Sequence, residues 1–167
     1  MTSSHALISA SQLRENKYLV QAALVGEEAR PPAGAPTPLT SSPPAQTRLP
    51  TLRLLTANVL TPHRNAEAFL SLVRETRPDV LVTLESDAWW QNALAELDVD
   101  YPHSVKCPQD NLYGMHLYSR WPLLDSHVEF LVEEGVPSIH VLLQMPGGSR
   151  LRLHCLHPAP PSPPPMP

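Results

Sequence analysis

Cysteine is scarce in this 167-residue sequence, which contains only Cys107 and Cys155 and no CxxC pair. This argues against a disulfide scaffold, and two reduced thiols are expected. No apolar run approaches the ~18 residues of a membrane-spanning helix, so no transmembrane helix is expected. The first residues also lack the basic stretch and apolar core of a secretory signal.

Positive charge is scarce as well. Twelve Lys and Arg stand against sixteen Asp and Glu, a formal net charge of −4. This composition argues against a broad cationic surface for nucleic acid or anionic lipid, but it is compatible with a small phosphate substrate. The sequence has no P-loop, GxGxxG, GxSxG or HExxH motif, so the chemistry that those motifs support is not indicated.

Proline, in contrast, is abundant, with 21 residues. Seven lie in 31–50 and seven in 158–167, and proline at that density cannot sit inside helices or sheets. The pattern predicts a flexible N-terminal segment and Pro-rich linker over 1–50, a folded domain over 51–157 and a Pro-rich tail over 158–167. Both flanks are expected to be disordered, although loosely spaced apolar residues could form a helix over 5–25.

The folded part begins with alternating strands and helices. Residues 52–59 and 80–84 are predicted strands, and the second is a continuous apolar run typical of a sheet covered on both faces. A helix is predicted over 65–76, with Asn65 as its N-cap and Ala66, Phe69, Leu70 and Val73 on its core face. Another helix is predicted over 87–97, with Trp90, Ala93, Leu94 and Leu97 facing the core.

After this unit the pattern changes to short strands at close spacing. These are predicted at 103–107, 113–119, 126–132, 138–145 and 150–157. Pro146 to Ser149 reads as the turn of a hairpin between the last two. Strand, helix, strand, helix and then a meander of strands indicate an α/β domain with a mixed sheet.

Polar side chains end the first two strands. A strand–helix–strand unit places its strands side by side and parallel, and ligands bind beyond their carboxyl ends. Asn58 and Glu85 should therefore converge at one edge, where their oxygens suit a hard cation such as Mg2+. The alternative is that Glu85 caps the following helix and Asn58 makes a turn.

Histidine is frequent, with eight residues. His157 ends the last predicted strand, where it could contact a phosphoryl oxygen or transfer protons, or could simply be a surface residue. His154 lies three residues earlier and should point to the opposite face, so the two make a poor metal-chelating pair. Others are expected to be scattered over the surface: His103, His116, His127 and His140.

Four segments occur in a familiar order: LRLLTANVL, RPDVLVTLES, DNLYGMHLYSRWPL and LRLHCLHP. Together they resemble the N-terminal half of the endonuclease/exonuclease/phosphatase superfamily, which includes pancreatic deoxyribonuclease and inositol-polyphosphate 5-phosphatases. The resemblance covers about residues 52–164. DNLYGMHLYSRWPL, VPSIHV and HCLHPAPPSP resemble an uncharacterised bacterial branch, whose members often carry N-terminal membrane helices that this sequence does not show.

The resemblance implies a mixed-sheet half of a deoxyribonuclease I-like four-layer α/β sandwich. It assigns Glu85 and Asn58 to a site for Mg2+ or Mn2+, with Glu85 holding the metal and Asn58 beside it. Tyr113 would lie near the scissile phosphate and His157 would contact a phosphate oxygen. The implied substrate is a phosphoester, either nucleic acid or a small or lipid phosphodiester.

The sequence departs from the family in its second half. A GDxN motif and a C-terminal SDH motif, which supply the oriented nucleophile and the general base, are both missing, and no Asp follows Asp125. We therefore expect a truncated hydrolase with little or no activity, able to self-associate through an uncovered sheet face. Alternatives are a non-catalytic metal- or partner-binding fragment, and an adaptor whose Pro-rich tail docks into an aromatic groove.

Overall fold

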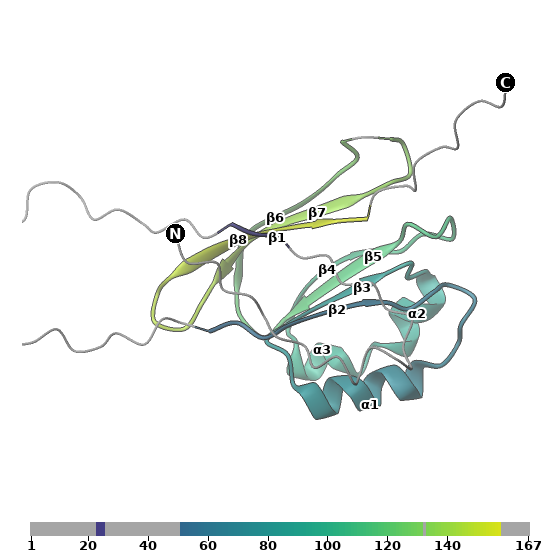
Figure 1. Cartoon of the computed structure of the whole chain (residues 1–167), viewed down its shortest axis with the longest axis horizontal. Helices are drawn as coiled ribbons and strands as arrows, with labels where there is room; N and C mark the ends of the chain where they lie inside the picture. Colours follow the sequence, from purple (N-terminus) through teal and green to yellow (C-terminus); the bar gives the residue numbers. More distant parts are fainter. Residues whose placement is uncertain (1–22, 26–50, 132, 158–167) are drawn as a thin grey trace, which may run out of the picture.

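The computed structural model describes residues 23–25, 51–131 and 133–157. In Figure 1 they form three layers: helices, a sheet whose strands run beside those helices, and a second sheet on the far side. The predictions for the linker over 31–50 and the tail over 158–167 lie outside the described residues, as does most of the helix predicted over 5–25.

The first sheet is mixed, as expected. Its strand order is β2-β3-β5-β4, with β2 at Leu54–Asn58, β3 at Val80–Leu84, β4 at His103–Cys107 and β5 at Met115–Ser119. β2 and β3 run parallel, whereas β5 is antiparallel to both β3 and β4. The predicted parallel strand–helix–strand unit is therefore confirmed.

The second sheet is antiparallel throughout, in the order β1-β8-β7-β6. It contains β1 at Ala23–Val25, β6 at Leu123–Glu129, β7 at Ser138–Gln144 and β8 at Arg150–Leu156. The predicted turn joins β7 to β8, and the Met145 amide donates to the Ser149 carbonyl across it at 2.8 Å. β6 starts and ends three residues before the predicted 126–132.

Two local predictions differ from the structure. The helix predicted over 5–25 is wrong at Ala23–Val25, because these residues form a strand that pairs with Arg152–His154 of β8. The helix predicted over 87–97 divides into α2 at Ala88–Ala93 and α3 at Leu97–Asp100. Between them the Leu97 amide donates to the Leu94 carbonyl, a three-residue spacing that tightens the chain and interrupts the α-helix.

Helix α1 at Ala66–Thr76 forms as its sequence predicts. The Asn65 side chain accepts a hydrogen bond from the Ala68 amide at 3.2 Å, and Phe69, Leu70 and Val73 are buried. None of the helices within the described ranges is long and apolar enough to cross a membrane.

Strand β3 separates two apolar cores, which explains its continuous apolar sequence. Leu81 packs on the helix side with Trp90 and Tyr118. Val80 and Val82 pack on the other side, against side chains of the second sheet such as Val141. All five residues of β3 are buried.

The far face of the antiparallel sheet is different, because no described helix covers it (Figure 1). β6, β7 and β8 direct most of their apolar side chains into the core between the sheets, although Leu124 and Leu156 are exposed. Their alternate positions carry polar side chains on the opposite face, among them Asp125, His127, His140, Arg152 and His154. One solvated and one buried face is the usual arrangement of an antiparallel sheet.

Candidate functional site

The parallel pairing of β2 and β3 brings Asn58 and Glu85 together. Asn58 is paired with Leu84, so Glu85 follows directly at the carboxyl edge of the neighbouring strand. The Asn58 Nδ2 atom donates a hydrogen bond to Glu85 Oε1 at 2.5 Å. The predicted convergence of these two side chains is confirmed.

The orientation of the Asn58 amide follows from its second contact. Its Oδ1 atom accepts a hydrogen bond from the Leu60 amide at 2.9 Å, which leaves Nδ2 to face Glu85. Asn58 thus makes a turn and also holds the carboxylate. Glu85 does not cap α2, because Asp87 performs that role by accepting from the Trp90 amide at 3.0 Å.

The backbone turns sharply at Glu85. Its φ angle is +58°, in the left-handed region that costs a residue other than glycine on the order of 1 kcal/mol or more. The Thr61 hydroxyl donates to the Glu85 carbonyl at 2.6 Å, and the Ser86 amide donates to the Gly114 carbonyl at 3.0 Å. These bonds hold a conformation that the local sequence alone would not favour.

Gly114 allows the loop after Glu85 to lie against the start of β5. A Cβ atom on Gly114 would stand 2.0 Å from the Ser86 carbonyl oxygen and 2.6 Å from the Gln109 amide nitrogen, so only glycine fits. This close approach brings the preceding residue, Tyr113, to the same edge of the molecule as Glu85.

His157 completes the group. It follows β8 of the second sheet, and its Nε2 atom lies 3.5 Å from Glu85 Oε1. The rings of Tyr113 and His157 are adjacent, with centroids 5.6 Å apart. All four residues that the sequence assigned to a site therefore lie together. We call this group, Asn58, Glu85, Tyr113 and His157, the Glu85 corner.

The Glu85 carboxylate has one oxygen without a partner. Oε2 is buried and makes no hydrogen bond with any described residue, while Oε1 contacts Asn58 and His157. A buried unpartnered carboxylate oxygen is costly, and a cation is the partner that suits it. Mg2+ is commonly bound by one or two carboxylates, with waters and substrate phosphates as its remaining ligands, so the residues at this corner fit such an ion.

The corner contains no preformed multidentate cage. Within the described ranges, no three or more His, Cys, Asp or Glu side chains are grouped so as to hold a metal ion. Asp87 is two residues from Glu85, but its carboxylate is bonded to Arg64 at 2.8 Å, which holds the pKa of Asp87 below its usual range.

Arg64 and Trp89 are neighbours of this corner that the sequence analysis missed. The Arg64 guanidinium lies over the Trp89 ring, 4.7 Å from its centroid, and Trp89 is 39% exposed. An exposed aromatic ring with a cation over it presents both stacking surface and positive charge at the rim. No local sequence signal separates this arrangement from an ordinary helix start.

The expectation of scattered surface histidines is wrong for His116, His127 and His140, whereas His103 is partly exposed as expected. His116 is completely buried on β5. His127, His140 and His154 form a row across β6, β7 and β8, because the antiparallel register pairs each with the next. The prediction that His154 and His157 point to opposite faces agrees with their contacts, since His154 meets His140 and His157 meets Glu85.

Comparison with known proteins gives one family match. A family model described as Endonuclease/Exonuclease/phosphatase family matches residues 55–167. A search of curated protein sequences finds no match.

Several solved structures share the fold. TDP2 from D. rerio, crystallised with a single-strand DNA product, has a TM-score of 0.51 and 18% identity over 60% of this chain. An endonuclease/exonuclease/phosphatase from Beutenbergia cavernae has a TM-score of 0.50 and 20% identity over 64% of this chain. The chain spans 43% and 38% of the length of these two structures, and at such identities the likeness concerns the fold alone.

Proposed function

The chain belongs to the endonuclease/exonuclease/phosphatase family, and from this premise we propose that the Glu85 corner is a divalent-metal site for phosphoester hydrolysis. The observation that carries the proposal is the buried, unpartnered Oε2 atom of Glu85. It lies among three side chains that can contact a phosphate or orient the carboxylate.

Each residue has a separate part in this proposal. Glu85 is the metal ligand, and Asn58 beside it holds the carboxylate through its Nδ2 atom. His157 and Tyr113 supply hydrogen bonds to phosphate oxygens, because their rings lie together next to Glu85. Mg2+ or Mn2+, when bound, would offset negative charge that develops on the phosphoryl group.

The substrate class is a phosphoester, in nucleic acid or in a small or lipid phosphodiester. Two observations make single-stranded DNA the first substrate to test. The similar D. rerio structure contains a single-strand DNA product. The exposed Trp89 ring, with Arg64 over it, resembles the stacking surfaces on which unpaired bases rest.

A metal-binding function without turnover is the second candidate. It is favoured by the sequence, which has neither a GDxN nor an SDH motif. Loss of a general base alone typically lowers a rate by about 10²–10⁴-fold. We therefore expect the 167-residue chain by itself to bind the metal and to hydrolyse phosphoesters slowly or not at all.

Metal binding is the first test. Mn2+ affinity of the full chain is measured by electron paramagnetic resonance for the wild type, Glu85→Gln and the control Glu67→Gln, which changes an exposed carboxylate on α1. We expect Glu85→Gln to weaken binding by about tenfold or more, and Glu67→Gln to have no effect. Equal affinities in the three proteins would refute the metal site.

Turnover is measured on the same proteins. With Mn2+ or Mg2+ present, single-stranded DNA, plasmid DNA and bis(p-nitrophenyl) phosphate are offered as substrates. Hydrolysis that Glu85→Gln abolishes would show that the chain carries a working hydrolase site. Metal binding without hydrolysis would support the second candidate, and equal turnover in wild type and Glu85→Gln would point to a contaminating enzyme.

A further inference from the structure

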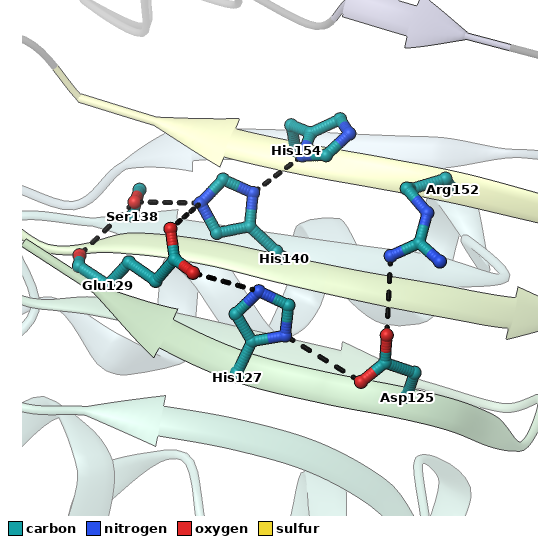
Figure 2. A network of polar contacts seen from close by, with 7 residues as sticks. All are labelled: Asp125, His127, Glu129, Ser138, His140, Arg152 and His154. Atoms are coloured by element: carbon teal, nitrogen blue, oxygen red, sulfur yellow. Dashed lines mark hydrogen bonds and ion pairs between the residues drawn. The ribbon is translucent and has the colours of Figure 1, made fainter. Parts of the chain in front are cut away.

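The polar face of the antiparallel sheet carries three histidines in one row (Figure 2). His127 is paired with His140 across β6 and β7, and His140 with His154 across β7 and β8. The rings of His140 and His154 have centroids 4.8 Å apart, and those of His127 and His140 are stacked at 5.3 Å. This row lies on the opposite face of the sheet from the core and shares no residue with the Glu85 corner.

Hydrogen bonds around Ser138 determine which ring nitrogen of neutral His140 carries the proton. The Ser138 hydroxyl donates to the Glu129 carbonyl at 3.1 Å, so its proton is already used. Its oxygen also lies 2.9 Å from His140 Nε2 and must accept a hydrogen bond from that nitrogen. Neutral His140 therefore carries its proton on Nε2, which leaves a free lone pair on Nδ1.

That lone pair points at His154. The Nδ1 atoms of His140 and His154 lie 2.5 Å apart, so in the absence of a ligand His154 must donate a proton from Nδ1 across this contact. A ring nitrogen with a free lone pair, whose other nitrogen donates to a fixed acceptor, is the arrangement that metal-binding histidines adopt. Here Ser138 is the fixed acceptor.

We propose that His140 and His154 form a two-histidine site for a borderline transition-metal ion such as Zn2+, bound between their Nδ1 atoms. The metal takes the place of the shared proton, and His154 then carries its proton on Nε2. Two nitrogens on one tetrahedral Zn2+ stand about 3.3 Å apart, so the rings have to separate by roughly 0.8 Å. Water completes the coordination, since no third ligand is preformed in the described part of the chain.

The surrounding charges favour a cation on balance. Glu129 lies 3.3 Å from His127 and 3.9 Å from His140, and Asp125 lies 3.7 Å from His127. Arg152 on β8 is the one opposing cation drawn in Figure 2, and it is paired with Asp125 at 3.3 Å. Burial, and then the nearby His154, lower the pKa of His140, which keeps its imidazole neutral and able to bind a metal.

The experiment titrates Zn2+ into the full chain in the presence of excess Mg2+, which occupies oxygen sites, with and without Glu85→Gln. Histidine ring nitrogen resonances are followed by NMR, and affinity is measured by competition with a chromogenic chelator. We expect Zn2+ to shift the Nδ1 resonances of His140 and His154 in both backgrounds. His154→Gln should weaken binding by about tenfold or more, because it removes one of two ligands.

His103→Gln, a partly exposed histidine on β4, is the matched control and should leave Zn2+ affinity unchanged. His140 is buried, so His140→Gln is interpreted only if its circular dichroism matches the wild type; the wild-type resonances and His154→Gln decide the question without it. Zn2+ affinity that His154→Gln does not change, or Zn2+ shifts confined to other histidines, would overturn the proposal.

Discussion

At the scale of single residues, His116 has an unusual environment. It is completely buried on β5, and neither ring nitrogen has a hydrogen-bond partner among the described residues. Burial, and to a smaller extent the charge of Lys106, lower its pKa from 6.5 to about 4, whereas Asp87 acts in the opposite direction. The folded protein therefore holds His116 neutral at pH values where the unfolded chain binds a proton.

This environment predicts acid sensitivity. The pKa of His116 is lower in the folded protein than in the unfolded chain. His116 therefore does not change the free energy of unfolding above pH 6.5, where it is neutral in both states. As the pH drops from 6.5 towards 4, only the unfolded chain binds the proton, so the free energy of unfolding falls. The difference between the two pKa values corresponds to roughly 3 kcal/mol of unfolding free energy. Urea unfolding at pH 7.5, 5.5 and 4.5 should show that the free energy of unfolding decreases less at low pH for His116→Met than for the wild type. An equal loss in both proteins would show that other groups cause it.

At the scale of secondary-structure elements, the contact between β5 and the loop after β3 determines the position of Glu85. Gly114→Ala would force a Cβ atom to within 2.0 Å of the Ser86 carbonyl oxygen, which is backbone and cannot rotate away. We expect a loss on the order of 2–3 kcal/mol in unfolding free energy, because overpacking has this cost. Mn2+ affinity should fall as well, because Glu85 precedes Ser86.

The matched control is Gly147→Ala in the β7–β8 turn. Gly147, unlike Gly114, has a positive φ, +86°, and a Cβ atom there would meet nothing within 4 Å. It should cost about 1 kcal/mol through backbone strain and leave Mn2+ affinity unchanged. The comparison fails to support the proposed contact if both variants lose the same stability and neither changes metal binding.

The elements that the sequence predicted well are those with strong local signals. Asn65 and the spacing of Phe69, Leu70 and Val73 locate α1, because capping and helical periodicity are properties of neighbouring residues. The apolar run of β3 indicates a strand buried on both faces. Asn58 and Glu85 could be placed together because consecutive parallel strands end at one edge.

The features that the sequence did not predict depend on pairing between distant segments. β1 exists only through its ladder with β8, more than 120 residues later in the sequence. The histidine row depends on the register of three strands, which is fixed by core packing and by the turn after Met145 rather than by the histidines themselves. The burial of His116 likewise requires knowing which helices cover that side of β5.

At the scale of the whole molecule, the predicted self-association can be given a location. The face of the antiparallel sheet that no described helix covers is lined by His, Asp, Glu and Arg side chains, which do not favour apolar association (Figure 2). Leu156 at the end of β8 is an exposed apolar side chain on this sheet, and a group of three others lies on edge strand β6 and just beyond it, at Leu124, Phe130 and Leu131. An edge strand beside exposed apolar residues is a surface on which a second copy can pair.

We therefore expect the chain to associate as its concentration rises, and we expect Phe130→Asp and Leu131→Asp together to suppress this. Phe130 is 50% exposed and Leu131 64% exposed, so charges there remain solvated and should leave the free energy of unfolding within about 0.5 kcal/mol of the wild type. Sedimentation velocity over a series of concentrations measures the association. Val99→Asp is the matched control, because Val99 on α3 is 86% exposed and lies on the helix side of the molecule, away from β6. A wild type that stays monomeric throughout, or a double variant that associates as strongly as Val99→Asp, would exclude this surface as the contact.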